Sequence, residues 1–246
     1  EAVQLCDALI AHFQPKLLAG LSVLVTAGPT FEAIDPVRGI TNHSSGKMGF
    51  AVARAAAEAG ALVTLVAGPV HLPTPQGVRR INVQSAAQML QAVLPEAALH
   101  DIFVATAAVA DWRPLQAAEH KIKKDGSGQP PALQMTENPD ILATVARLPA
   151  AQRPWCVGFA AESHDLLRHA REKLVRKGVP LIVANIGPAT FGQDDNTLVL
   201  VDAQGDHALP HGDKLSLARL LVRHIAAQMP PPASTDQGAP AGRVAP

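Results

Sequence analysis

Short apolar runs alternate with alanine-rich stretches along most of the chain. The runs contain many β-branched residues and are apolar at nearly every position, which is typical of strands buried on both faces of a sheet. The stretches between them carry apolar residues at helical spacing. We therefore predict strands at Leu21 to Thr26, Leu62 to Ala67, Ile102 to Ala107, Trp155 to Ala160 and Leu181 to Ala184, with a hairpin or edge strand at Thr197 to Asp202. We predict helices at Gly46 to Gly60, Ala86 to Leu94, Pro139 to Leu148, Leu166 to Lys177 and Leu215 to Gln228.

This alternation predicts an α/β fold: a Rossmann-like, doubly wound, mostly parallel sheet with helices on both faces and an added flap or hairpin. A chain of 246 residues with 48% apolar content lies at the upper end of single-domain size. Ligands of such folds bind beyond the carboxyl ends of the strands. The candidate chemistry is therefore expected where the strands end.

The two ends of the chain differ from the middle. Val3 to Phe13 has the spacing of an amphipathic helix. We expect residues 1–16 to be a helical arm, or the remnant of a preceding domain, and residues 17–229 to form the main domain. Residues 230–246 contain Pro, Ala, Gly and Ser with almost no large apolar residue, so we expect a disordered tail.

The overall charge excludes some partners. With 21 Lys plus Arg against 21 Asp plus Glu, the chain has no bulk field that would draw it to nucleic acid or to a membrane surface. No apolar run approaches the ~20 residues of a transmembrane helix. Two distant cysteines form no disulfide framework, which indicates a reducing compartment, and we expect a cytoplasmic protein. The ten histidines form no HxH or HExxH pattern, so we predict no metal ligands among them.

Polar residues and glycines crowd together between the first strand and the next helix, from Thr41 to Gly49. Free backbone N–H groups and the positive end of that helix favour an anion there. An N-capped helix with glycines that allow close helix–sheet packing explains the same residues. Gly46 and Lys47 superficially resemble a Walker A loop, but Met48 replaces the required Ser or Thr.

The segment from Ala105 to Pro114 follows the third long strand. Its small side chains allow a base or ribose to approach the backbone, and Asp111 offers an acceptor. Tight packing with a surface ion pair between Asp111 and Arg113 is equally compatible. A dinucleotide oxidoreductase is disfavoured, because the chain has no GxGxxG and no tyrosine.

Lysines recur in two later segments. In an extended segment Lys121 and Lys123 share one face, so a mobile flap could bring cations onto phosphates, although lysine runs are usually solvated. Lys173 and Lys177 lie four apart on a helix, where like charges repel unless an anion lies between them. Between these segments, Asn138 as the cap and Pro139 as the first helical residue predict a helix start.

Six motifs together resemble the phosphopantothenoylcysteine synthetase family, the carboxyl-terminal half of a bacterial bifunctional coenzyme A biosynthesis protein. The resemblance spans Leu17 to Met229. The motifs are residues 35–38 (DPVR), 42–49 (NHSSGKMG), 107–113 (AAVADWR), 121–124 (KIKK), 138–141 (NPDI) and 158–162 (GFAAE). The chain departs from the family pattern at Phe31, Ala33 and Gly39.

The resemblance implies a two-step ligase reaction. CTP, assisted by Mg²⁺, activates 4′-phosphopantothenate as an acyl-cytidylate with release of pyrophosphate, and L-cysteine then displaces CMP to form an amide. It also implies a homodimer and fusion to a flavin-dependent decarboxylase domain. A nucleotide-binding oxidoreductase, or a non-catalytic binding module, remains the alternative from another class.

The resemblance also assigns roles to residues. Asn42 would contact the acyl-cytidylate, and Lys121 would be the flap lysine that meets the nucleotide phosphates. The cytidine pocket would consist of Ala105, Thr106, Ala107, Asp111, Pro139, Asp140, Ile141, Leu142 and Phe159, with Lys173 and Lys177 on its cationic side.

Overall fold

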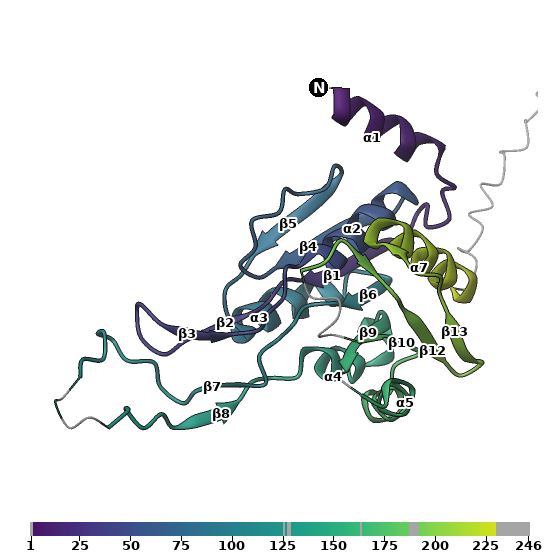
Figure 1. Ribbon diagram of the computed structural model, residues 1–246. Coiled ribbons are helices and arrows are strands. Elements are labelled where there is room, and N and C mark those ends of the chain that lie inside the picture. The colour runs from purple at the N-terminus through teal and green to yellow at the C-terminus, as the bar shows by residue number, and fades with distance from the viewer. Residues whose placement is uncertain (1, 125, 127–128, 163, 187–191, 230–246) are drawn as a thin grey trace, which may run out of the picture.

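A computed structural model describes residues 2–124, 126, 129–162, 164–186 and 192–229, with an eight-stranded sheet at its centre (Figure 1). The strands are β1 (Ser22–Ala27), β4 (Leu62–Ala67), β5 (Val78–Asn82), β6 (Ile102–Ala105), β9 (Trp155–Glu162), β10 (Leu181–Ile186), β12 (Val199–Asp202) and β13 (Gly205–Ala208). They lie in the order β13-β12-β10-β9-β6-β1-β4-β5. The six strands from β10 to β5 are parallel, and β12 and β13 are antiparallel.

Helices cover both faces of the sheet, as Figure 1 shows. The helices on one face are α2 (Lys47–Glu58) and α7 (Lys214–Gln228), and those on the other are α3 (Ala86–Ala97), α4 (Ile141–Ala146) and α5 (Leu166–Lys177). In β1, Val23 and Val25 belong to one apolar core and Leu24 to the other. Strands buried on both faces explain why the apolar runs do not alternate. The predicted Rossmann-like, doubly wound fold is confirmed.

An arm projects from one end of this body (Figure 1). It consists of two antiparallel hairpins, residues 31–41 and 112–137. Their paired strands are β2 (Phe31–Ala33) with β3 (Gly39–Thr41), and β7 (Trp112–Pro114) with β8 (Met135–Glu137). The phenyl ring of Phe31 covers Gly39, so that a Cβ at position 39 would lie 2.3 Å from Phe31 Cζ. The predicted flap or hairpin corresponds to this arm.

The amino-terminal helix α1 (Ala2–Phe13) corresponds to the helix predicted at Val3 to Phe13. It contacts the main domain, because Asp7 forms an ion pair with Arg54 of α2 at 2.7 Å. Leu5, Leu9 and Phe13 nevertheless remain 76%, 58% and 75% exposed. The predicted tail at 230–246 lies outside the described residues.

Several smaller elements complete the structure. These are a 3₁₀ turn at Ala150–Gln152 and the short pair β11 (Asp195–Asn196) with β14 (Gly212–Asp213). The predicted hairpin or edge strand at Thr197 to Asp202 corresponds to β12, which forms a hairpin with β13. None of the described helices is long and apolar enough to cross a membrane.

Candidate functional site

The winding of the sheet reverses between β1 and β6. From β1 the chain continues outward to β4 and β5, then returns through α3 to β6 on the other side of β1. Such a reversal leaves a crevice at the carboxyl ends of the two strands. A pocket of about 1070 Å³ opens there. Its lining includes every predicted site residue except Lys121: Asn42, Ala105, Thr106, Ala107, Asp111, Pro139, Asp140, Ile141, Leu142, Phe159, Lys173 and Lys177.

Backbone hydrogen bonds fix one wall of the pocket. The N–H of Thr106 donates to Thr26 O at 3.2 Å, and the N–H of Ala108 donates to Gly28 O at 2.9 Å. The N–H of Ala110 donates to Thr30 Oγ1 at 3.0 Å. These bonds continue the chain beside β1 after β6 has ended at Ala105, two residues before the predicted end. This wall of the pocket therefore consists of backbone fixed by hydrogen bonds and of small side chains.

The start of α2 forms a second wall. Gly46 occupies its N-cap position with φ of 75°, and no side chain caps the helix. By contrast, α3, α4 and α7 each have a side-chain cap. Gly49 allows close packing, since a Cβ there would lie 2.5 Å from Ala27 Cβ. The alternative of an N-capped helix with closely packed glycines is thus confirmed for the packing of Gly49, whereas no side chain caps α2. The first-turn residues of α2 line the pocket at the positive end of the helix.

Asn42 lies between these two walls. Its Nδ2 donates to Ala108 O at 3.1 Å, which ties the loop before α2 to the backbone after β6. A primary amide carries two N–H groups. One holds the side chain in position, and the other is free to donate to a ligand.

The helix start beyond β8 differs from the prediction. Asp140, not Asn138, caps α4, and its Oδ1 accepts from the N–H of Ala143 at 2.9 Å. Asn138 instead donates to Ala110 O at 2.8 Å and accepts from Arg113 Nη1 at 3.0 Å. Pro139 therefore precedes the cap. The Asn138 amide, which both donates and accepts, ties the segment before α4 to the chain that follows β6.

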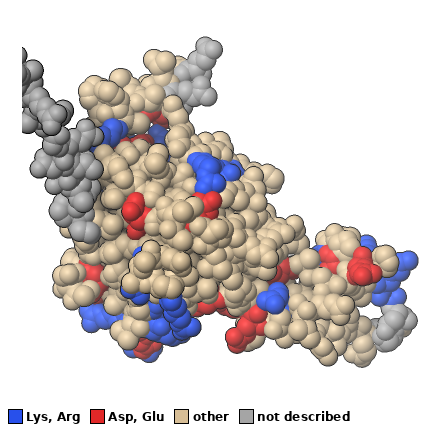
Figure 2. All heavy atoms as spheres, turned by 180° about the vertical axis from the view of Figure 1, so that it is seen from behind, with Lys and Arg blue, Asp and Glu red and all other residues tan. Residues whose placement is uncertain are grey.

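Two lysines of α5 provide the cationic side. Lys173 Nζ donates to Phe159 O at 2.7 Å, and Lys177 forms an ion pair with Asp140 Oδ2. Burial lowers the pKa of the Lys173 ammonium, and the charge of Glu162 opposes this shift. Burial also lowers the pKa of Lys177, and Asp111 opposes it. Figure 2 shows positive and negative groups mixed over one face, with Lys and Arg most concentrated where Figure 1 places α5.

Some lining residues were not predicted. Lys47 reaches Asp194 Oδ1 at 2.7 Å, and Asn185, Asn196 and Lys214 line the same pocket. Burial lowers the pKa of Lys214, which stands at the start of α7. Lys47 belongs to the motif at 42–49 and to a poor Walker A match, but it was given no role of its own. Asn185, Asn196 and Lys214 lie at a strand end, in a short strand and at a helix start, where the sequence shows no motif.

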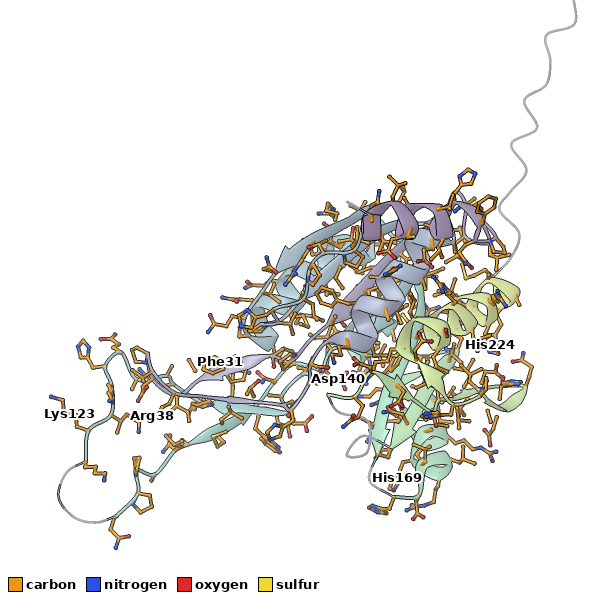
Figure 3. All side chains as sticks on the ribbon, turned by 45° about the horizontal axis from the view of Figure 1, so that its top comes forward. Phe31, Arg38, Lys123, Asp140, His169 and His224 are labelled. Carbon is orange, nitrogen blue, oxygen red and sulfur yellow. The ribbon has the colours of Figure 1, made fainter. Side chains whose placement is uncertain are left out.

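Lys121 lies apart from the pocket, on the arm. The next residue, Ile122, donates its N–H to Asp35 Oδ2 at 3.1 Å and accepts from Arg38 Nη2 at 2.7 Å. The Arg38 guanidinium, at 2.6 Å, holds the pKa of the buried Asp35 carboxyl well below its usual range. Figure 3 shows Arg38 and Lys123 far along the arm, away from Asp140. The phosphate role of Lys121 stays a prediction.

The sheet order and the crevice define a Rossmann-like α/β protein with a pocket at the switch point. The chain belongs to the family described as the DNA/pantothenate metabolism flavoprotein C-terminal domain, which matches residues 18–229.

Named relatives support the same family. The Coenzyme A biosynthesis bifunctional protein CoaBC of Vibrio cholerae is 54% identical over 228 residues, which cover 90% of this chain and 57% of that protein. The protein of the same name from Escherichia coli K12 is 46% identical over 230 residues, covering 92% of this chain and 56% of its own length. The chain thus spans little more than half of these relatives. The crystal structure of the C-terminal domain of a CoaBC protein, 36% identical, superposes with a TM-score of 0.73 and covers 86% of this chain and 97% of that domain.

Proposed function

We propose that the chain is a phosphopantothenate–cysteine ligase of coenzyme A biosynthesis that uses CTP. The observation that carries the proposal is the convergence of Asn42, the backbone after β6, the start of α4 and the two α5 lysines on one pocket. Membership of the family, and the names of relatives that cover most of this chain, support it.

In the proposed first step, a carboxylate of 4′-phosphopantothenate attacks the α-phosphorus of CTP, and pyrophosphate leaves. Negative charge grows on the leaving oxygens, so cations and N–H donors aimed at them accelerate the step. The uncapped start of α2, with Lys173 and Lys177 opposite, supplies such groups. The pocket, at about 1070 Å³, is large enough for a nucleotide beside a second substrate.

In the proposed second step, the amine of L-cysteine attacks the acyl carbon, and CMP leaves. The carbonyl oxygen becomes negative as the amine adds. The free N–H of Asn42 would donate to that oxygen, since its other N–H is held by Ala108 O. An amide does this without competing as a base.

The side chains at the mouth fit a Mg²⁺ ion bound to the nucleotide. Mg²⁺ uses one or two carboxylates together with substrate phosphates. Asp111 and Glu137 are exposed and line the pocket, whereas Asp140 is paired with Lys177. Glu137, together with Asp111 beside the ribose, would hold the ion, which would neutralise phosphate charge when bound.

We also propose a homodimer in which the arm of one chain serves the pocket of the other. The arm projects from the body, and Figure 3 shows its Arg38 and Lys123 away from Asp140, which lines the pocket. Lys121 belongs to this arm, next to Ile122, which is bound to Arg38. In a dimer, the arm of one chain would bring Lys121 to the nucleotide phosphates in the partner's pocket without a change in the arm's conformation. Sedimentation that shows only monomer at micromolar concentration would contradict this part of the proposal. In full-length form we expect fusion to a decarboxylase domain, since the relatives are named bifunctional.

We expect specificity for CTP, because hydrogen bonds fix the backbone of the pocket walls in place. Cytosine offers an exocyclic amine and a ring acceptor that the backbone around Ala107 and Ile141 would match, and buried hydrogen bonds discriminate strongly between bases. A kcat/KM for ATP equal to that for CTP would contradict this reading of the pocket.

The test of the ligase is incubation with CTP, Mg²⁺ and 4′-phosphopantothenate without cysteine. We expect pyrophosphate release and an acyl-cytidylate detectable by mass analysis, which cysteine then converts to the amide. Ligand binding without either product would indicate a non-catalytic module. A fluorescence change with NADPH and no reaction with CTP would favour an oxidoreductase.

A further inference from the structure

Two histidines and an aspartate meet at the outer edge of the sheet, away from the pocket. Asp202 ends β12, His207 lies in β13 and His224 lies in α7. His207 Nε2 is 3.2 Å from Asp202 Oδ1, and His224 Nε2 is 2.9 Å from Asp202 Oδ2. Figure 3 labels His224 on α7, well apart from Asp140 at the pocket.

The spacing of these atoms is that of ligands around one small cation. One ligand atom from each residue lies within 4.8 Å of the others. In a tetrahedral site with metal bonds of about 2.0 Å, neighbouring ligand atoms are about 3.3 Å apart. The two contacts, at 3.2 and 2.9 Å, run to different oxygens of Asp202, so with either oxygen as the ligand one contact is close to that edge length. We propose that Asp202, His207 and His224 form a binding site for a divalent first-row transition metal ion, with Zn²⁺ as the expected occupant.

The donor set selects this class of ion. Imidazole nitrogen suits Zn²⁺ and its neighbours, whereas Mg²⁺ prefers oxygen ligands throughout. The metal binds the unprotonated Nε2 of each imidazole, and a proton carried on that atom is released. The side chains of His207 and His224 are 41% and 21% exposed, so an ion enters from solvent and water completes its coordination.

The carboxylate is already held in place. Asp202 has a side chain only 1% exposed. Its Oδ1 accepts the backbone N–H groups of Gln204 and Gly205 at 2.8 and 3.1 Å, and its Oδ2 accepts from Gln228 Nε2 at 2.7 Å. Such hydrogen bonds orient a metal ligand from behind and commonly raise affinity.

A second group of similar composition serves as the comparison. Among the described residues, His164, Asp165 and His169 also lie within ligand distance of one another. There the guanidinium of Arg168 stands 2.9 Å from Asp165 Oδ2 and 3.0 Å from His169 Nε2. A cation already occupies the space beside those ligand atoms. At the Asp202 group the corresponding neighbour is the uncharged amide of Gln228, whose Nε2 lies 2.8 Å from His224 Nε2 and would turn away when an ion binds. The proposal therefore assigns metal binding to the Asp202 group alone.

A metal at Asp202 would join the β12–β13 hairpin to the last turns of α7. This is a structural role at the edge of the sheet, and it does not depend on the proposed ligase reaction. It predicts a zinc-dependent gain in thermal stability of the whole chain.

The test is titration of the full chain with ZnCl₂ against a chelating dye, in millimolar MgCl₂ to suppress oxygen-ligand sites. We expect one Zn²⁺ per chain and a rise in Tm. His207→Gln and His224→Gln should each weaken binding at least about tenfold, and the double variant should show no rise in Tm. His207 is half exposed on an edge strand, so we expect His207→Gln to fold. Its Zn²⁺ affinity tests the site if the other variants do not fold.

His169→Gln and Cys6→Ser are the matched controls, and both should bind Zn²⁺ as the parent does. Three results would overturn the proposal: no stoichiometric Zn²⁺ binding by the parent, unchanged affinity in folded His207→Gln, or loss of binding in either control.

Discussion

The pocket and the arm both carry residues that the sequence singled out, yet they hold them in different ways. Pocket residues stand at the ends of buried strands, and backbone bonds such as Ala108 N–H to Gly28 O fix them. At the tip of the arm, Arg38 and Asp35 provide the tie to Ile122. Strand order alone brings the pocket together, because parallel strands end at one edge. No such rule places an arm, and its lysine lies away from the site that it was predicted to serve.

Asn42→Asp should have the largest effect and tests the pocket. A carboxylate would face Ala108 O and offer an acceptor where the proposed intermediate needs a donor. Loss of one oriented donor commonly costs about 3 kcal/mol, or roughly a hundredfold in rate. We expect pyrophosphate release and acyl-cytidylate with little amide, measured by quenched-flow mass analysis. Asn42→Ala, which removes the donor without adding charge, is the control. Amide formation at the parent rate would remove Asn42 from the mechanism.

Lys121→Gln tests the arm. Pyrophosphate release should fall about tenfold or more, because the lysine acts on charge that develops on the leaving group. Rates within about twofold of the parent would show that the lysine is only solvated.

Mixing the two variants separates the two ways in which the arm could act. If the arm serves the partner's pocket, an Asn42→Asp chain paired with a Lys121→Gln chain has one intact site. An equal mixture should then recover about a quarter of parent activity. If each arm serves its own pocket, both sites are defective and no activity returns.

Arg38→Ala should have a smaller effect, confined to the arm. It removes the guanidinium that joins Asp35 to the carbonyl of Ile122, whereas the sheet and its two cores are untouched. We expect a severalfold slower first step, faster proteolysis near Lys121, and a Tm within about 2 °C of the parent. Arg38→Lys keeps the charge without the fork geometry and should be intermediate. A large fall in Tm would show that the arm supports the body.

The smallest expected effect is a change of CTP affinity with pH, which should depend on the pocket lysines and not on the arm lysines. Burial lowers the pKa of Lys173 below its usual 10.5, so its ammonium is lost at a lower pH than that of an exposed lysine. CTP affinity should therefore weaken severalfold on the alkaline side. Lys173→Arg should move this loss to higher pH, and Lys121→Gln should leave its midpoint in place. An identical pH profile for Lys173→Arg would contradict the assignment.

Local signals predicted much of the fold. The predicted bounds of β4 and α5 agree with the structure, and α5 ends where Gly178 adopts φ of 64°. The strand β5 was missed because arginines interrupt its apolar pattern. Arg79 reaches Thr64 Oγ1 and Arg80 reaches Leu72 O, which an edge strand permits. Side-chain contacts of this kind produce no alternating apolar pattern from which the strand could be predicted.

The candidate site was predictable where motifs follow strands and unpredictable where it depends on distant segments. Asn42 and Ala107 follow from the family resemblance and from strand order. Asn196 and Lys214 enter the pocket through the short strands before α7, whose positions only tertiary packing determines. The cap at Asp140 was misassigned to Asn138, because both side chains can cap and only the neighbouring Arg113 and Ala110 distinguish them.

The ring of Phe31 over Gly39 has a consequence for the history of this chain. Two departures from the family pattern meet in one contact, because a Cβ at residue 39 would lie 2.3 Å from Phe31 Cζ and 2.7 Å from Glu32 O. We therefore expect a side chain at residue 39 to be tolerated only where residue 31 leaves room and the hairpin backbone at Glu32 shifts. Residues 31 and 39 should therefore covary among relatives, and swapping either one alone into another member of the family should be less tolerated than swapping both.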